Sequence, residues 1–196
     1  MSTDQLPKLE GYEVLLSVTG GIACYKSAGL ASRLVQSGAG VTAAMTESAT
    51  RFVAPLTFQT LTGRQVFTSM WQSSERYDPH HVSLTERADL MIVAPATANI
   101  IAKMAGGIAD ELVSALALSA CGACEILIAP AMNTRMWEAP ATRANVAVLS
   151  ERGVHVIGPG EGFLACRAFG KGRMAEPDEI LKAAAELLRK KPPKGK

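Results

Sequence analysis

Few aromatic residues and little net charge set the first limits on what this chain does. Aromatic side chains make up 5% of its 196 residues, and 20 Lys and Arg against 18 Asp and Glu leave a formal charge of +2. So small a charge supplies no strong field for a nucleic-acid backbone, and we expect no nucleic-acid partner. Alanine (31 residues) and glycine (17 residues) are abundant instead. Small side chains of this kind allow helices to pack closely on a parallel sheet.

Cysteines and targeting features are equally scarce. Four cysteines in a chain of this length do not resemble the disulfide framework of a secreted protein. The first residues contain no basic segment followed by an apolar one, which is unlike a signal peptide. No uncharged apolar run reaches about 18 residues, the length that a membrane span needs. These features predict a cytoplasmic protein without a membrane partner.

Short apolar runs alternate with segments of helical spacing along the chain. The apolar runs are residues 12–18, 41–45, 89–95, 125–130 and 154–157, and the helical segments are residues 22–36, 49–61, a stretch from 97, 111–120, 142–152 and 177–189. This alternation predicts an α/β fold, a doubly wound (Rossmann-like, flavodoxin-like) parallel sheet with helices on both faces. We predict one domain over residues 1–190 and a basic flexible tail over residues 191–196.

Three of the predicted strands end in turns of small or polar residues, at 19–23, 45–48 and 94–99. Ligands of doubly wound sheets bind outside the carboxyl ends of the strands. The first turn places Gly20 and Gly21 before a helix, whose N–H groups and dipole favour a phosphate. It matches neither the GxGxxG nor the P-loop pattern. The three turns predict a mononucleotide pocket, with glycines that merely turn the chain as the alternative.

Other candidate residues have simpler explanations. Cys121 and Cys124 form a CxxC pair away from the predicted pocket and without a second pair, so we predict packing cysteines and no metal site. We predict that the polar segment 65–79 is a long loop. His80 and His81 follow directly at its end, and their position alone leaves their role open. The basic, glycine-rich segment 163–174 suits a flap over an anionic substrate and also an ordinary surface loop.

A stronger indication comes from Pro130-Ala131-Met132-Asn133-Thr134-Arg135-Met136-Trp137. It resembles the PxMNxxMW motif of the homo-oligomeric flavin-containing cysteine decarboxylase family and follows a predicted strand. Four more stretches resemble that family: residues 20–23 with Lys26, 81–84 with 88–89, 97–100 with 105–110, and 164–166 with 170–174. The last is similar to the substrate clamp of members that act on 4'-phosphopantothenoylcysteine. Arg167 and Ala168 depart from the Gly and Asp that usually follow the clamp cysteine.

The resemblance implies FMN as the cofactor and a role for individual residues. His81 would be the base that helps to oxidise the substrate thiol, and Cys166 would protonate the enethiolate carbon. Asn133 and Met132 would bind the substrate, and Lys171 and Arg173 are candidates for its phosphate. The residues implied for FMN are Gly20, Gly21, Ile22, Ala23, Thr46, Glu47, Ser48, Thr97, Ala98, Asn99, Ile100 and Ala131.

The resemblance also implies a reaction and partners. The reaction is the decarboxylation of 4'-phosphopantothenoylcysteine to 4'-phosphopantetheine in coenzyme A biosynthesis. The chain would assemble as a homotrimer or an assembly of trimers such as a homododecamer. A separate phosphopantothenate–cysteine ligase would act upstream, since we expect no synthetase domain in this chain. A peptidyl-cysteine decarboxylase, a flavin prenyltransferase and a non-catalytic FMN-binding regulatory subunit are the alternatives.

Overall fold

A five-stranded parallel sheet forms the centre of the computed structural model, which describes residues 6–71, 80–165 and 167–194, with the backbone alone for His80 and His81. The strands lie in the order β2-β1-β3-β4-β5. Their bounds are β1 Glu13–Val18, β2 Gly40–Met45, β3 Leu90–Ala96, β4 Glu125–Pro130 and β5 His155–Val156. Each neighbouring pair is parallel, and the order is that of flavodoxin-like sheets. The predicted fold class is confirmed.

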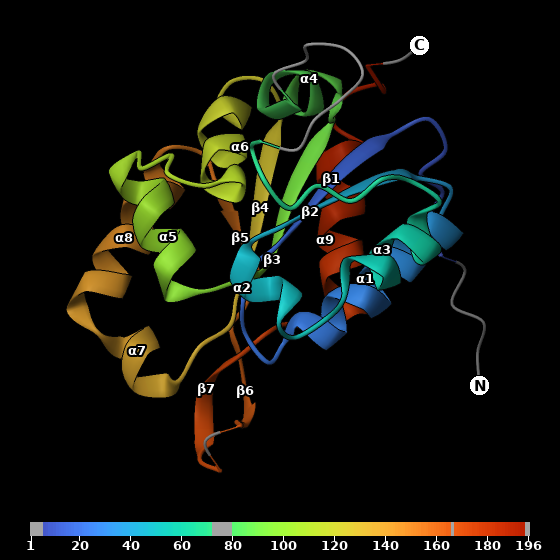
Figure 1. Cartoon of the computed structure of the whole chain (residues 1–196). Coiled ribbons are helices and arrows are strands. Elements are labelled where there is room, and N and C mark those ends of the chain that lie inside the picture. The colour runs from blue at the N-terminus through green and yellow to red at the C-terminus, as the bar shows by residue number, and fades with distance from the viewer. Residues whose placement is uncertain (1–5, 72–79, 166, 195–196) are drawn as a thin grey trace.

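Helices cover both faces of this sheet (Figure 1). One face carries α1 Cys24–Gln36, α3 Pro55–Thr62 and α9 Pro177–Leu188; the other carries α4 His80–Arg87, α5 Ala98–Gly106, α6 Leu112–Ala120 and α8 Pro140–Glu151. Two short helices, α2 Glu47–Thr50 and α7 Thr134–Glu138, follow the ends of β2 and β4. Within the described part of the chain, no helix has the length and apolar character needed to cross a membrane.

The central strands are mainly apolar because both of their faces are buried. In β1, Leu16 and Val18 pack with α1 and α9, whereas Leu15 packs with the helices of the other face. Each of these side chains is at most 1% exposed. Since successive side chains of a strand point to opposite faces, a strand covered on both sides loses the usual apolar–polar alternation. The continuous apolar runs of the sequence have this cause.

Several helices differ from the sequence prediction. The helix expected over residues 49–61 is in fact two, because α2 ends at Thr50 and the proline that starts α3 lacks the N–H that a continuous helix would need. Helices α4 and α7 lie in stretches for which we predicted none. Residues 72–79, the second half of the predicted long loop, lie outside the described residues.

The segment 163–174, predicted as a basic loop or flap, belongs to a β-hairpin that begins at residue 160. Its strands, β6 Gly160–Phe163 and β7 Phe169–Arg173, pair antiparallel and extend away from the main sheet (Figure 1). Gly160, Gly162, Gly170 and Gly172 give these strands little intrinsic β propensity, and no apolar alternation marks them in the sequence. The hairpin was therefore missed by sequence analysis.

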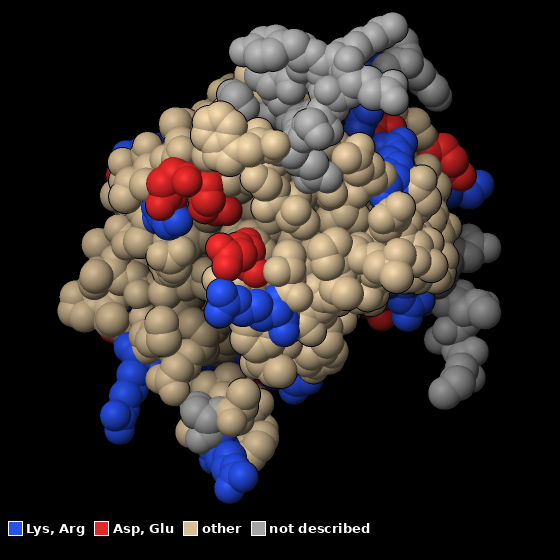
Figure 2. All heavy atoms as spheres, in the orientation of Figure 1, with Lys and Arg blue, Asp and Glu red and all other residues tan. Residues whose placement is uncertain are grey.

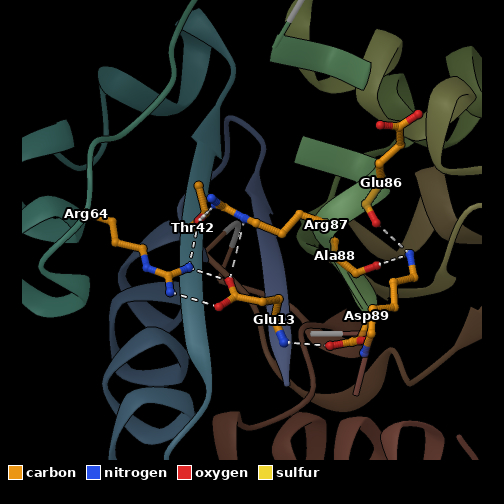
Figure 3. A network of polar contacts seen from close by, with 8 residues as sticks. Glu13, Thr42, Arg64, Glu86, Arg87, Ala88 and Asp89 are labelled. Atoms are coloured by element: carbon orange, nitrogen blue, oxygen red, sulfur yellow. Dashed lines mark hydrogen bonds and ion pairs between the residues drawn. The ribbon is translucent and has the colours of Figure 1, made fainter. Parts of the chain in front are cut away.

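Charged side chains gather at the edge of the sheet where β1, β2 and β3 begin (Figure 3). Arg64 donates hydrogen bonds to both carboxylate oxygens of Glu13 and, over 3.2 Å, to Thr42 Oγ1. The same Thr42 oxygen accepts a hydrogen bond from Arg87 at 3.0 Å. The hydrogen bond from Arg64 lowers the pKa of Glu13, so this ion pair persists at neutral pH.

Part of the predicted flexible tail lies against the same edge. Lys191 Nζ is 3.1 Å from Glu125 Oε1, and the Lys191 carbonyl accepts a hydrogen bond from the Tyr12 hydroxyl at 3.0 Å. Lys194 donates hydrogen bonds to three backbone carbonyls. The structure thus orders residues 191–194 through their polar groups rather than through apolar burial. Residues 195 and 196 lie outside the described residues.

Ser17 in β1 gives a test of the packing around this sheet. Its side chain is fully buried, and its hydroxyl has no hydrogen-bond partner among the described residues. Because an unpaired buried hydroxyl is destabilising, we expect Ser17→Ala to raise the free energy of unfolding in urea by about 1 kcal/mol.

The matched control is Ser27→Ala in α1, which is buried to the same degree. The Ser27 hydroxyl donates to the Ala94 carbonyl at 2.6 Å, so its removal is expected to lower the free energy of unfolding by about 1 kcal/mol. Equal destabilisation by the two substitutions would contradict the prediction.

Candidate active site

The carboxyl ends of β1, β2 and β3 border a cavity of about 860 Å³. The loop after β4 and the β6–β7 hairpin complete its walls. A cavity of this volume is in the range of small-molecule sites. The structure places at this cavity all twelve residues that the resemblance implies for the cofactor, which are Gly20, Gly21, Ile22, Ala23, Thr46, Glu47, Ser48, Thr97, Ala98, Asn99, Ile100 and Ala131.

The turn after β1 needs glycine because it touches the turn after β2. A Cβ added at Gly20 would lie 2.3 Å from the Ser48 Cβ, so a larger residue would separate the two turns. Helix α1 follows with Ala23 as its N-cap, and no described side chain caps its first turn. The N–H groups and positive dipole end of such a helix favour an anionic group.

Hydroxyl groups join the turns after β1 and β3. The Thr19 hydroxyl donates to the Pro95 carbonyl at 2.6 Å and accepts from the Thr97 amide at 3.2 Å. The Thr97 hydroxyl accepts from the Ile100 amide and so caps α5, and the Thr46 hydroxyl caps α2 in the same way. These bonds fix the positions of the turns relative to one another, and so give the cavity a defined shape.

The Asn133 loop and the β6–β7 hairpin meet through glycine. The Met132 amide donates to the Gly172 carbonyl at 3.0 Å. A Cβ at Gly172 would lie 2.1 Å from the Met132 carbonyl oxygen, and one at Gly170 would lie 2.6 Å from Thr134 Oγ1. Asn133 Oδ1 accepts a hydrogen bond from the Arg135 amide at 2.8 Å, which fixes the side chain at the start of α7. The two glycines therefore let β7 lie directly on the loop that carries Asn133.

An ion triad fixes the base of the hairpin to α1. Glu176 Oε1 lies 2.9 Å from Lys26 Nζ and 2.6 Å from Arg173 Nη2, and the same Lys26 ammonium donates to the Met174 carbonyl at 3.1 Å. The hydrogen bond from Lys26, which is 7% exposed, lowers the pKa of the Glu176 carboxyl despite the opposing effect of burial. Lys26 and Arg173 both line the cavity, so the triad joins the first turn to the hairpin.

The predicted substrate and catalytic residues are not all at the cavity. Met132, Asn133 and Arg173 line it, whereas Lys171, an exposed residue of β7, does not. Cys166 lies outside the described residues, although its neighbours Leu164 and Ala165 line the cavity.

His81 lies in the first turn of α4, and its side chain is outside what the structure describes. No described residue of α4 lines the cavity, and Figure 1 shows α4 at the end of the sheet away from α2 and the hairpin. One copy of the chain therefore brings together the three strand-end turns, Asn133 and the hairpin, but not α4.

Sequence analysis missed two charged residues of the cavity wall, Lys103 and Glu111. Lys103 comes four residues after Asn99 on α5, so helical spacing from a residue already chosen would have indicated it. It pairs with Asp110 at 2.7 Å, and that hydrogen bond lowers the pKa of the Asp110 carboxyl. Glu111 is the N-cap of α6.

The CxxC pair lies at the other end of the sheet, just before β4. Burial raises the pKa of Cys124 to about 11, so its thiol stays protonated at neutral pH. Among the described residues, no group of three or more His, Cys, Asp or Glu side chains has the arrangement to hold a metal ion.

Arg167 occupies the position at which the resembling family has glycine. Its φ of 62° is left-handed, a conformation that glycine adopts without strain. Hydrogen bonds from the Arg167 amide to the Leu164 carbonyl (2.9 Å) and from the Leu164 amide to the Ala168 carbonyl (2.8 Å) hold the tip in this shape. Arg167 thus adopts the left-handed backbone conformation that suits the glycine found at this position in the family.

This geometry predicts a difference between two substitutions that both remove the cation. Arg167→Gly relieves the left-handed strain and Arg167→Ala does not, so we expect the opening free energy at the Leu164 amide, measured by hydrogen exchange, to be higher in Arg167→Gly by about 1 kcal/mol. Equal exchange rates in the two variants would show that residue 167 does not hold this conformation.

Comparison with known proteins agrees with this architecture. The flavoprotein family model matches residues 2–189. The coenzyme A biosynthesis bifunctional protein CoaBC of Bacillus subtilis (strain 168) is 48% identical over 176 residues, which cover 90% of this chain and 43% of that protein. The same-named protein of Escherichia coli (strain K12) is 42% identical over 176 residues, with the same shares covered. The chain thus spans less than half the length of these relatives.

Solved structures extend the likeness to three dimensions. A cysteine-to-serine mutant of PPC decarboxylase, complexed with pantothenoylaminoethenethiol, superposes with a TM-score of 0.83 at 30% identity, over 93% of this chain and 100% of that one. The FMN-dependent cysteine decarboxylase SpaF gives a TM-score of 0.79 at 29% identity, over 91% and 96% of the two chains. With a family model that covers almost its whole length, the chain belongs to the flavoprotein family.

Proposed function

We propose that the chain catalyses the FMN-dependent decarboxylation of 4'-phosphopantothenoylcysteine to 4'-phosphopantetheine, a step of coenzyme A biosynthesis. The observation that carries the proposal is the meeting of three strand-end turns, the Asn133 loop and the β6–β7 hairpin in one cavity. The similar proteins are named for coenzyme A biosynthesis, for PPC decarboxylase and for FMN-dependent cysteine decarboxylation, which supports the same reaction.

The residues at the cavity suit FMN. Helices α1 and α5 both begin there, so the positive ends of their dipoles favour a phosphate at the cavity. Ile22, Ala98 and Ala131 offer apolar surface to an aromatic ring system. When bound, FMN would accept a hydride from the CH2–SH carbon of the substrate and later return it, so the whole reaction is redox-neutral.

The chain's own residues would handle the protons and hold the substrate. His81 would take the thiol proton as the CH2–SH group becomes a thioaldehyde, a role that suits an imidazole near neutral pH. The thiocarbonyl lies β to the carboxylate and receives the electron pair of the breaking C–C bond, so CO2 leaves and an enethiolate remains. Asn133 would hold the carboxylate and amide of the substrate through its side-chain amide. Cys166 would then protonate the enethiolate carbon.

Of the two candidates for the substrate phosphate, Arg173 has the stronger support. It lines the cavity, whereas Lys171 does not. Its guanidinium already pairs with Glu176 at 2.6 Å, so a phosphate would share this cation with Glu176 or replace that partner. Lys26 would keep Glu176 paired in either case, because it contacts the same carboxylate oxygen.

A homo-oligomer, a trimer or an assembly of trimers, is part of the proposal. Because α4 lies away from the cavity of its own chain, His81 would serve the cavity of a second copy. Large apolar side chains at the cavity support such a contact, since Ile22, Tyr25, Met136 and Phe163 are 61%, 63%, 49% and 68% exposed. Figure 2 shows a wide area without Lys, Arg, Asp or Glu on the face drawn.

We also propose a domain arrangement, a compartment and an upstream enzyme. Residues 1–190 would form one domain, and the chain would act in the cytoplasm after a separate phosphopantothenate–cysteine ligase. The relatives named CoaBC are bifunctional and more than twice as long as the matched region.

The role of His81 predicts the behaviour of two inactive variants when mixed. His81→Asn is expected to keep its FMN but to lose about 10²–10⁴ in the rate of substrate oxidation, because the base is missing. If His81 acts on a neighbouring copy, mixed oligomers of His81→Asn and Asn133→Ala should regain turnover, since some sites would combine an intact His81 with an intact Asn133. Anaerobic flavin reduction and CO2 release measure both effects.

His80→Asn is the control, since it changes the adjacent residue of the same helix turn. If His80→Asn loses turnover and His81→Asn keeps it, the general base is His80 rather than His81. Failure of every mixture to regain turnover would contradict the shared site.

The role of Cys166 predicts where the reaction stops in Cys166→Ser. A serine hydroxyl is a far weaker acid than a thiol with a pKa of about 8.5, so oxidation and decarboxylation should proceed but protonation should fail. We expect an enethiol that is lighter than 4'-phosphopantetheine by two hydrogen atoms, measured by mass spectrometry after one anaerobic turnover. The aminoethenethiol ligand named for the similar cysteine-to-serine mutant is a compound of the same kind.

If Cys166→Ser instead forms 4'-phosphopantetheine at the wild-type yield, Cys166 is not the proton donor and serves only in packing. Release of an enethiol by the wild-type chain from a peptidyl cysteine would favour the peptidyl-cysteine decarboxylase instead. FMN binding without CO2 from either substrate would favour a regulatory subunit.

A further inference from the structure

The last turn of α4 lies at the edge of the sheet opposite the cavity, among the charged residues of Figure 3. The final carbonyls of any helix lack partners within the helix, and they carry its negative dipole end. In α4 these groups belong to a helix of eight residues, which is too short to be stable by itself. Its position therefore depends on tertiary contacts, which include the burial of Leu84 in the core and the polar contacts at its end.

Lys194 supplies such contacts from the far end of the sequence. Its ammonium donates to the carbonyls of Glu86 (3.0 Å), Ala88 (2.7 Å) and Ala123 (2.8 Å). Three carbonyls match the three N–H donors of a lysine. Two of them belong to the end of α4 and the residue just after it, and the third belongs to the turn before β4. One side chain thus ties α4 to the start of the main sheet.

The backbone of Lys194 is fixed in the same place. Its amide donates to Asp89 Oδ1 at 2.9 Å, while Asp89 Oδ2 accepts the Glu13 amide at 2.8 Å. Asp89 therefore joins the C-terminal segment to the first residue of β1. These contacts set the ammonium beside the end of α4.

Two further residues, Arg87 and Thr85, hold α4 on its other sides. Arg87 donates to Thr42 Oγ1 at 3.0 Å and lies 3.8 Å from Glu13 Oε2, which ties the last residue of α4 to β1 and β2. The Thr85 hydroxyl is 2.9 Å from that of Ser119 in α6. The helix is thus attached at its C-terminal half, whereas His80 and His81 form its start, about 10 Å further along at 1.5 Å per residue.

We propose that Lys194 is a positioning residue for α4: by clamping the carbonyls at the helix end it holds the helix that carries His81. The part that concerns catalysis rests on the proposed function, in which His81 is the base. A base must be within hydrogen-bond reach of its proton, and a displacement of about 1 Å can reduce a rate 10²-fold. The clamp therefore acts on the chemical step and not on substrate binding, since the residues proposed for the substrate lie elsewhere.

The test compares Lys194→Met, which keeps the apolar stem and removes the ammonium, with Lys182→Met. Lys182 is an exposed residue of α9 outside the clamp. In the FMN-loaded protein, we expect Lys194→Met to speed amide hydrogen exchange in α4 by about tenfold, while exchange in β1 and β3 stays as in the wild type. With 4'-phosphopantothenoylcysteine, kcat should fall several-fold and KM should stay unchanged. Lys182→Met should alter none of these quantities.

Unchanged exchange in α4 of Lys194→Met would overturn the clamp, and so would equal acceleration in α4 and in β1, which would indicate general destabilisation. Faster exchange in α4 with an unchanged kcat would overturn the positioning role. A wild-type protein without turnover would contradict the proposed function instead, and the exchange measurement would still test the clamp.

Discussion

Burial of both faces of the parallel sheet is the constraint on which the rest of the structure depends. Helices cover the two faces, and the strands between them bury mainly apolar side chains. Polar chemistry is then confined to the two edges, where strands begin and end. Each edge has its own set of residues in this protein: glycine and hydroxyl turns with the cavity at the carboxyl edge, and ion pairs with the C-terminal segment at the amino edge.

At the carboxyl edge, close approach between segments defines the site. Gly20 lets the first turn touch Ser48, and Gly172 lets the hairpin lie on Met132. The triad of Lys26, Glu176 and Arg173 then joins these two regions by charge. Glycines, which have no side chain, thus set the shape of this edge, and the carboxylate of Glu176 balances the charges of Lys26 and Arg173. A substrate anion bound to Arg173 would therefore change the electrostatic interaction between Glu176 and Lys26 in the first turn of α1.

At the amino edge, charge replaces close packing. The carboxylates of Glu13 and Asp89 accept hydrogen bonds from Arg64, from the β1 backbone and from Lys194, and the end of α4 lies among these groups. Helix α4 carries the proposed base yet lies away from the cavity of its own chain. In the proposed oligomer, α4 of one copy would lie at the cavity of another.

The sequence by itself determined the sheet and the strand-end turns that border the cavity, because continuous apolar runs and the small residues that follow them are local features. It also indicated the loop at Asn133 through its motif. Only the tertiary structure decided that glycine-rich residues 160–173 form a hairpin and that Lys171 lies off the cavity. It also placed α4 and Lys194 together. These facts depend on which distant segments touch, and local residue preferences carry no information on contacts between residues far apart in the chain.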